Sequence, residues 1–166
     1  MTKARWWVVV QFFLLGLLGL LCFSGPRSGL IAWSRPIGPV LLAVGCLLIL
    51  VAYLTFRSVN GWNLGIAPVP KASDSLVDRG IFAHIRHPIY LGVMLASFGV
   101  ALLSASLDAL VVAFCLVVFF VLKARYEEGQ LTRKFPDYSS YQSRTGPFFP
   151  RLFASGRMHK WGGGSG

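Results

Sequence analysis

The sequence predicts an all-α fold: a polytopic membrane protein with four transmembrane helices. Hydrophobic residues make up 55% of the 166 residues and charged residues only 13%, whereas an average soluble domain is about 25% charged. The apolar residues gather in four long runs that are almost free of charge, as a bilayer requires of a spanning helix. These observations exclude a disordered chain and argue strongly against a soluble fold.

The four runs define the expected spans in chain order. They cover residues 6–23, 37–56, 88–106 and 108–126, and each approaches the roughly 20 residues that a bilayer core demands. The first run is longer than the apolar core of a signal peptide and no small-residue cleavage site follows it, so we expect it to be retained. Few residues separate the third and fourth runs, which should therefore form a tight helical hairpin. We expect residues 1–161 to form one domain and residues 162–166 to be a linker or fusion remnant.

The distribution of cations predicts the orientation of the spans. With four spans, the N-terminus, the second loop and the tail share one side and carry 14 of the 16 Lys and Arg residues. Because cytoplasmic segments collect Lys and Arg, both termini should be cytoplasmic. Topology thereby explains the net charge of +10, and no nucleic-acid partner is expected. All three His and five of the six acidic residues fall on this side, where we expect the chemistry to lie.

The cysteines predict neither a metal site nor a disulfide. Cys22, Cys46 and Cys115 each lie in an apolar run, and none has CxxC spacing or a second ligand nearby. They are interpreted as small hydrophobic residues of the spans.

The first polar segment on the cytoplasmic side contains Arg86-His87-Pro88-Ile89-Tyr90. Pro88 suits the first turn of a helix, where a missing N–H costs nothing. His87 is then expected at the helix start, beside free backbone N–H groups that attract a carboxylate or a phosphate. The plainer interpretation is an Arg-His pair reaching the lipid headgroups, with Tyr90 in the interfacial aromatic belt. This segment alone does not decide between the two.

The second segment, residues 123–131, continues the fourth span out of the membrane. Lys123 and Glu127 are four residues apart and share a helix face, whereas Glu128 points about 100° away. Two adjacent carboxylates at a membrane exit need a compensating cation, so one of them can bind a cationic ligand. The plainer interpretation is a solvated helix face with one ion pair.

The third segment, residues 135–150, repeats Tyr138, Tyr141 and Arg144 at intervals of three residues. This spacing indicates one face of a short helix, which Pro147 ends. Alone, it is also typical of an amphipathic interfacial helix with an aromatic anchor.

Together and in this order, the three segments are far more specific. The sequence resembles the integral-membrane methyltransferases that include the isoprenylcysteine carboxyl methyltransferases and the phospholipid N-methyltransferases. Their pattern is Arg-His-Pro-x-Tyr-x-Gly, a hydrophobic hairpin, Glu-Glu, then spaced aromatic residues, an Arg and a closing Pro. It covers about residues 76–150. The matching residues are Arg86, His87, Pro88, Tyr90, Gly92, Glu127, Glu128, Phe135, Tyr138, Tyr141, Arg144 and Pro150.

The resemblance implies S-adenosylmethionine as the methyl donor, held between the last two helices and the segments that flank them. Carried over by position, the cofactor contacts are Leu76, Val77, Phe82, His87, Pro88, Tyr90 and Glu127. Residue chemistry agrees, because Glu127 can pair with the donor's ammonium. Arg86 or the helix start at His87 can take its carboxylate. Tyr90 and Phe82 can face the adenine or the sulfonium.

The class of methyl acceptor stays open. Lys123 stands where relatives hold an Arg that faces the acceptor. A carboxylate, as in prenylcysteine, is already ionised and needs a cation, which Lys123 or Arg144 can supply. An amine, as in phosphatidylethanolamine, must lose a proton, which Glu128 or His87 can accept. The ending from Arg144 to Pro150 favours the isoprenylcysteine type, and the hairpin favours a lipophilic or lipid-modified substrate that enters from the bilayer.

Two other classes of protein stay open as alternatives. An NADPH-dependent membrane reductase has a similar C-terminal architecture, although such reductases usually have more spans. A non-enzymatic four-span protein is the other. No glycine-rich dinucleotide-type turn occurs, which excludes a soluble-type methyltransferase fold. The sequence does not predict the oligomeric state.

Overall fold

A computed structural model describes residues 3–60 and 76–151, and most of these residues are helical. The elements in chain order are α1 (Lys3–Ser24), α2 (Gly29–Ala32), α3 (Ile37–Asn60), the short 3-10 helix η1 (Gly80–Ala83), α4 (Pro88–Ser104), α5 (Leu107–Lys134) and α6 (Tyr138–Arg144). The all-α prediction is confirmed, and the four expected spans correspond to α1, α3, α4 and α5. The predicted linker at 162–166 lies outside the described residues.

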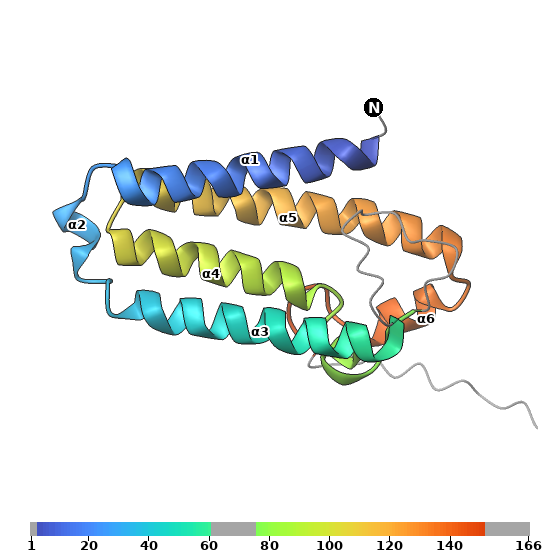
Figure 1. Cartoon of the computed structure of the whole chain (residues 1–166). Helices are drawn as coiled ribbons and strands as arrows, with labels where there is room; N and C mark the ends of the chain where they lie inside the picture. The colour runs from blue at the N-terminus through green and yellow to red at the C-terminus, as the bar shows by residue number, and fades with distance from the viewer. Residues whose placement is uncertain (1–2, 61–75, 152–166) are drawn as a thin grey trace, which may run out of the picture.

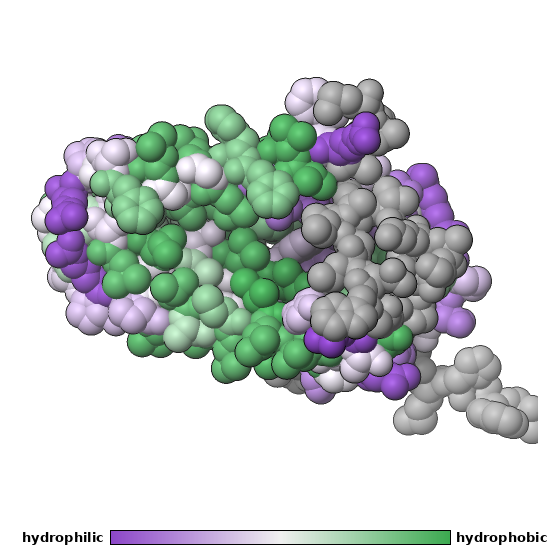
Figure 2. All heavy atoms as spheres, in the orientation of Figure 1, coloured by the Kyte–Doolittle hydropathy of each residue, from purple (hydrophilic) through white to green (hydrophobic). Residues whose placement is uncertain are grey.

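The four long helices lie side by side in the order α3, α4, α5, α1, so that α1 and α3 form the outer edges (Figure 1). Three of them are long and apolar enough to cross a membrane, over Arg5–Ser24, Ile37–Val59 and Leu107–Lys134. Hydrophobic side chains cover the visible face of the helices, and hydrophilic ones gather at the α2 end (Figure 2). This distribution is that of an integral membrane protein.

The fourth apolar helix, α4, has only 17 residues, about 26 Å at 1.5 Å per residue. It packs between α3 and α5, so protein covers more of it than of the outer helices. A tight hairpin joins it to α5, as the sequence predicts. Ala105 ends α4 in the left-handed conformation, and the Ser106 hydroxyl caps α5 by accepting a hydrogen bond from the Ala109 N–H.

Glycines set the contact between α3 and α4. A Cβ on Gly45 would lie 2.5 Å from the Gly92 carbonyl oxygen, and a Cβ on Gly99 would lie 2.8 Å from the Gly38 carbonyl oxygen. The backbones of the two antiparallel helices therefore touch at two points spaced seven residues apart on each helix. Small residues at a helix contact are a common packing mode in membranes. The contact fixes the position of α4 and hence of its first residues.

The buried face of α5 changes character towards its C-terminal end. Leu116 and Phe120 are fully buried in the apolar core, and Lys123 continues the same face one turn later. Lys123 is also buried, with 2% of its surface exposed. The apolar core of the bundle thus ends in a polar region between α1, α4 and α5.

Candidate active site

The polar region begins at the start of α4. His87 is the residue before the helix and Pro88 its first residue, as the sequence predicts. The His87 N–H donates to the Pro147 carbonyl oxygen at 2.9 Å, and the Arg86 N–H donates to the Gly146 carbonyl oxygen at 2.9 Å. The segment that follows α6 therefore holds the start of α4 in place.

Glu128 binds these two segments together. Its Oε1 accepts from Arg86 Nε at 2.7 Å and lies 3.2 Å from His87 Nε2, and its Oε2 accepts from the Gln142 amide at 2.8 Å. The Arg86 guanidinium also donates to the carbonyl oxygens of Gln142 and Thr145. We call Arg86, Glu128, Gln142 and Thr145 the clamp. Both charged side chains of the clamp are buried, with 6% and 14% exposed, and both oxygens of Glu128 are engaged.

Glu127 has a different environment, although it is the next residue. Its Oε1 accepts a hydrogen bond of 2.5 Å from the Tyr90 hydroxyl. Its Oε2 lies 3.9 Å from His87 Nδ1, beyond hydrogen-bond distance. The side chain is only 15% exposed. Among the described residues, Glu127 is thus a largely buried carboxylate with one oxygen that accepts no hydrogen bond.

Tyr90 lies at the centre of the site. Its ring stacks on His87, with centroids 5.3 Å apart and planes 2° from parallel, and contacts Phe120 at 4.9 Å. The Lys123 ammonium lies 5.0 Å from the centre of the same ring. Tyr90 therefore presents both a hydroxyl bound to Glu127 and an aromatic surface that favours a cation.

The hydrogen-bond partner of Lys123 lies on an unexpected element. Its ammonium donates to Gln11 Oε1 of α1 at 2.7 Å. Sequence reasoning gave the first span no part in the site. The one available signal was that Gln11 is the only strongly polar residue of that apolar run.

The aromatic residues of α6 hold the segment before α4. Tyr138 and Tyr141 are buried, and the Tyr141 hydroxyl donates to the Phe82 carbonyl oxygen at 2.6 Å. Burial raises the pKa of Tyr141 to about 12 and also raises the pKa of Tyr138, so both stay protonated at neutral pH. Phe82 and Val77 pack on Ala52 of α3.

Four of the predicted residues lie away from this centre or at its margin, namely Leu76, Val77, Phe82 and Arg144. Arg144 is 59% exposed and pairs with Asp78 at 3.3 Å, so the structure does not bring it beside Lys123. Leu76, the first described residue after the gap, is half-buried. The structure brings together Arg86, His87, Pro88, Tyr90, Lys123, Glu127 and Glu128, whereas the side chains of Val77 and Phe82 belong to a separate apolar cluster on α3. Within residues 3–60 and 76–151, no group of three or more His, Cys, Asp or Glu side chains is placed to hold a metal ion.

Comparison with known proteins gives one family and several relatives. The sequence profile of the family described as phospholipid methyltransferase matches residues 33–138. The nickel-cobalt-cadmium resistance protein NccN of Alcaligenes xylosoxydans xylosoxydans is 28% identical over 149 residues, covering 89% of this chain and 63% of its own. The cobalt-zinc-cadmium resistance protein CzcN of Cupriavidus metallidurans is 30% identical over 149 residues, which cover 89% of this chain and 62% of CzcN.

Two further relatives carry methyltransferase names. The protein-S-isoprenylcysteine O-methyltransferase of Saccharomyces cerevisiae is 32% identical over 115 residues, covering 64% of this chain and 48% of its own. The solved structure of the eukaryotic intramembrane Ras methyltransferase ICMT is similar in fold, with a TM-score of 0.62 at 22% identity. The alignment covers 90% of this chain and 54% of the ICMT chain. This chain spans less than two thirds of the length of each of these relatives.

Proposed function

This chain belongs to the phospholipid methyltransferase family, and from that premise we propose that it methylates a lipophilic acceptor with S-adenosylmethionine as the donor. The observation that carries the proposal is Glu127, a largely buried carboxylate with an oxygen that accepts no hydrogen bond among the described residues. Family membership also favours methyl transfer over the reductase and the non-enzymatic alternatives.

The residues present fit the donor. S-adenosylmethionine supplies a methyl group on a sulfonium, and it also carries an ammonium and a carboxylate. Glu127 Oε2 is available to accept from the ammonium by a charge-assisted hydrogen bond. The Tyr90 ring offers a surface for the positive charge. The first turn of α4 suits the carboxylate, although the N–H of His87 itself already donates to the Pro147 carbonyl oxygen. Arg86 is less suited to that role, because its guanidinium is already engaged in the clamp.

The acceptor is proposed to be a carboxylate of the isoprenylcysteine type. A carboxylate needs a cation and no base, and Lys123 is a buried cation beside Tyr90. An amine needs a base, and the candidates His87 and Glu128 lie 3.2 Å apart and engage each other. A phospholipid amine remains the second candidate, because the matching family profile carries that name.

The residues of this chain would contribute to the reaction by orienting the two reactants and by excluding water. In-line methyl transfer depends on alignment of donor and nucleophile. Lys123 and Glu127, one turn apart on α5, would hold opposite charges on the two reactants. Tyr90 and Phe120 form a rigid aromatic contact between them and the apolar core, which excludes water from one side of the site. The site is proposed to face the cytoplasm, together with both termini.

Titration calorimetry in detergent tests the donor assignment. The parent protein should bind S-adenosylhomocysteine and should not bind NADPH. Glu127→Gln keeps the size of the side chain and removes its charge, so it should weaken binding by about 1.5–3 kcal/mol, roughly tenfold or more. Asp137→Asn, which removes one charge at an exposed position, is the matched control and should bind as the parent does. Equal affinity of Glu127→Gln and the parent would refute the assignment.

A further inference from the structure

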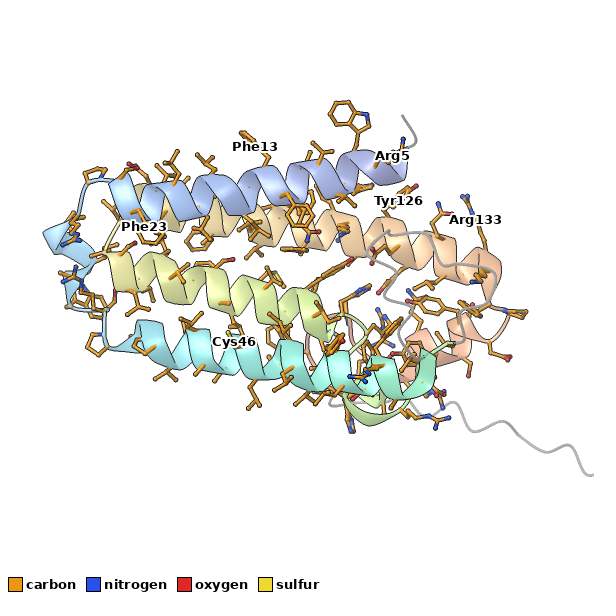
Figure 3. All side chains as sticks on the ribbon, in the orientation of Figure 1. Arg5, Phe13, Phe23, Cys46, Tyr126 and Arg133 are labelled. Atoms are coloured by element: carbon orange, nitrogen blue, oxygen red, sulfur yellow. The ribbon has the colours of Figure 1, made fainter. Side chains whose placement is uncertain are left out.

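The position of Gln11 on α1 is the starting observation. Trp7, one turn earlier, contacts the rings of Phe119 and Tyr126 on α5, and Leu18, two turns later, is buried in the core. Gln11 therefore lies on the face of α1 that packs on α5. Phe13 lies on the outer side of α1, away from α5 (Figure 3), and is 67% exposed. A carboxamide is costly on an apolar face unless it is hydrogen-bonded, and this one faces a buried cation.

That cation, Lys123, is incompletely satisfied. An ammonium has three N–H donors. Within the described part of the chain, Lys123 makes one hydrogen bond, to Gln11, and no ion pair. The Tyr90 ring at 5.0 Å supplies a further weak attraction. Glu127, one turn along the helix, attracts this buried ammonium, but no anion contacts it among the described residues, and two of its donors are unused. The site is therefore prepared for an anionic group that arrives with a ligand.

The nearest acid on the same helix face does not fill this role in the proposed reaction. Glu127 is one turn from Lys123, but its Oε1 accepts from Tyr90, and its Oε2 is assigned to the donor's ammonium. A second anion must then come to Lys123 from the acceptor. Gln11 is suited to share in binding it. Its Oε1 accepts from Lys123, which orients the carboxamide and leaves its two amide N–H donors for the same anion.

We infer that Gln11 and Lys123 together form an anion subsite for the charged head of the lipophilic acceptor, and that Gln11 determines specificity for that charge. The inference rests on the proposed function and extends the site to α1. The anion is a carboxylate on a prenylated cysteine or a phosphate on a phospholipid, since both present oxygens to N–H donors. A neutral carboxamide suits this task because it orients the ammonium without neutralising it.

Gln11→Glu separates this role from a purely structural one. If Gln11 merely held Lys123, a Glu would hold it at least as well, by an ion pair. If Gln11 and Lys123 bind an anion, a Glu would neutralise the cation and repel the acceptor. We expect the KM for N-acetyl-S-farnesylcysteine to rise about tenfold or more. S-adenosylhomocysteine affinity and Tm should stay near those of the parent. Gln11→Met, which only removes the amide, should raise the KM by a smaller factor.

One control variant and a second acceptor complete the experiment. Ser139→Glu adds the same charge at an exposed position on α6 and should leave the KM unchanged. Phosphatidylethanolamine is the second acceptor, and the acceptor whose KM rises in Gln11→Glu identifies the anion as carboxylate or phosphate. If the parent binds S-adenosylhomocysteine and methylates an acceptor, and Gln11→Glu has the same KM for that acceptor, the subsite is overturned and the proposed function is not. A parent that neither binds the donor analogue nor methylates either acceptor overturns the proposed function as well. If Gln11→Glu does not fold, a KM within twofold of the parent in Gln11→Met overturns the subsite.

Discussion

Glu128→Gln should destabilise the protein far more than the same substitution at the neighbouring Glu127. Glu128 is the anionic centre of the clamp, with Arg86 Nε at 2.7 Å and the Gln142 amide at 2.8 Å. The Arg86 side chain is only 6% exposed, so the substitution would leave a buried guanidinium without its counter-charge. Breaking such a pair costs about 3–5 kcal/mol. At about 2–4 °C per kcal/mol for a chain of this size, Tm should fall by about 6–20 °C.

Glu127→Gln is the matched control, because its one hydrogen-bond partner among the described residues is the neutral Tyr90 hydroxyl. Glu127→Gln should lower the free energy of unfolding by only about 1 kcal/mol. Thermal unfolding in detergent, followed by tryptophan fluorescence, measures both variants. Adding Arg86→Leu to Glu128→Leu removes both charges, and the loss should be smaller than the sum of the two single losses by about 2 kcal/mol. The clamp is disproved if the two Gln variants share one Tm, or if the double variant loses the full sum.

Three other predictions concern packing, acceptor chemistry and topology. Gly45→Ala should lower the free energy of unfolding by about 1–3 kcal/mol, because its Cβ would lie 2.5 Å from the Gly92 carbonyl oxygen. Gly16→Ala is the control and should not destabilise the protein, because a Cβ there has nothing within 4 Å. Equal Tm values for the two variants would refute the close contact. With a carboxylate acceptor, turnover should be nearly flat from about pH 6 to 8, because a carboxyl pKa near 3.5 leaves it ionised throughout; a rate that climbs with pH in a pH–rate profile would indicate an amine instead. Cysteines introduced at Ser24, the exposed last residue of α1, and at the exposed Ser139 of α6 should react with an impermeant maleimide from opposite sides of sealed vesicles. Labelling of both from one side would contradict the expected topology.

The spans and the hairpin were predictable because their signals are local. Long uncharged runs predict membrane helices directly. Pro88 predicts the start of α4, because proline favours the first turn of a helix. The different roles of Glu127 and Glu128 were partly predictable, since adjacent helical residues point about 100° apart. Which partners they meet was not, because Tyr90 and Arg86 are some 40 residues away in the chain, as their hydrogen bonds record.

Long-range contacts account for the rest. The hydrogen bond between Gln11 and Lys123 joins residues 112 positions apart, and no spacing rule reaches that far. The exposed position of Arg144 was not predictable for the same reason. The three-residue repeat places it near Tyr141 but does not show that it pairs with Asp78, 66 residues away, at the surface. Helix order within the bundle, with α4 between α3 and α5, likewise depends on the glycine contacts of the folded chain.

The unequal lengths of α4 and α5 bear on how the proposed reaction is supplied. At 1.5 Å per residue, α4 is about 26 Å long and α5, with 28 residues, about 42 Å. Because the hairpin aligns them at one end, α4 starts about 16 Å short of the other end of α5, beside Lys123 and Glu127. An acceptor confined to the bilayer would reach the start of α4 by lateral diffusion. The concentration of acceptor that the enzyme meets is then its mole fraction among the lipids. Membrane growth without new acceptor would therefore slow methylation, even though the number of acceptor molecules per cell stays constant.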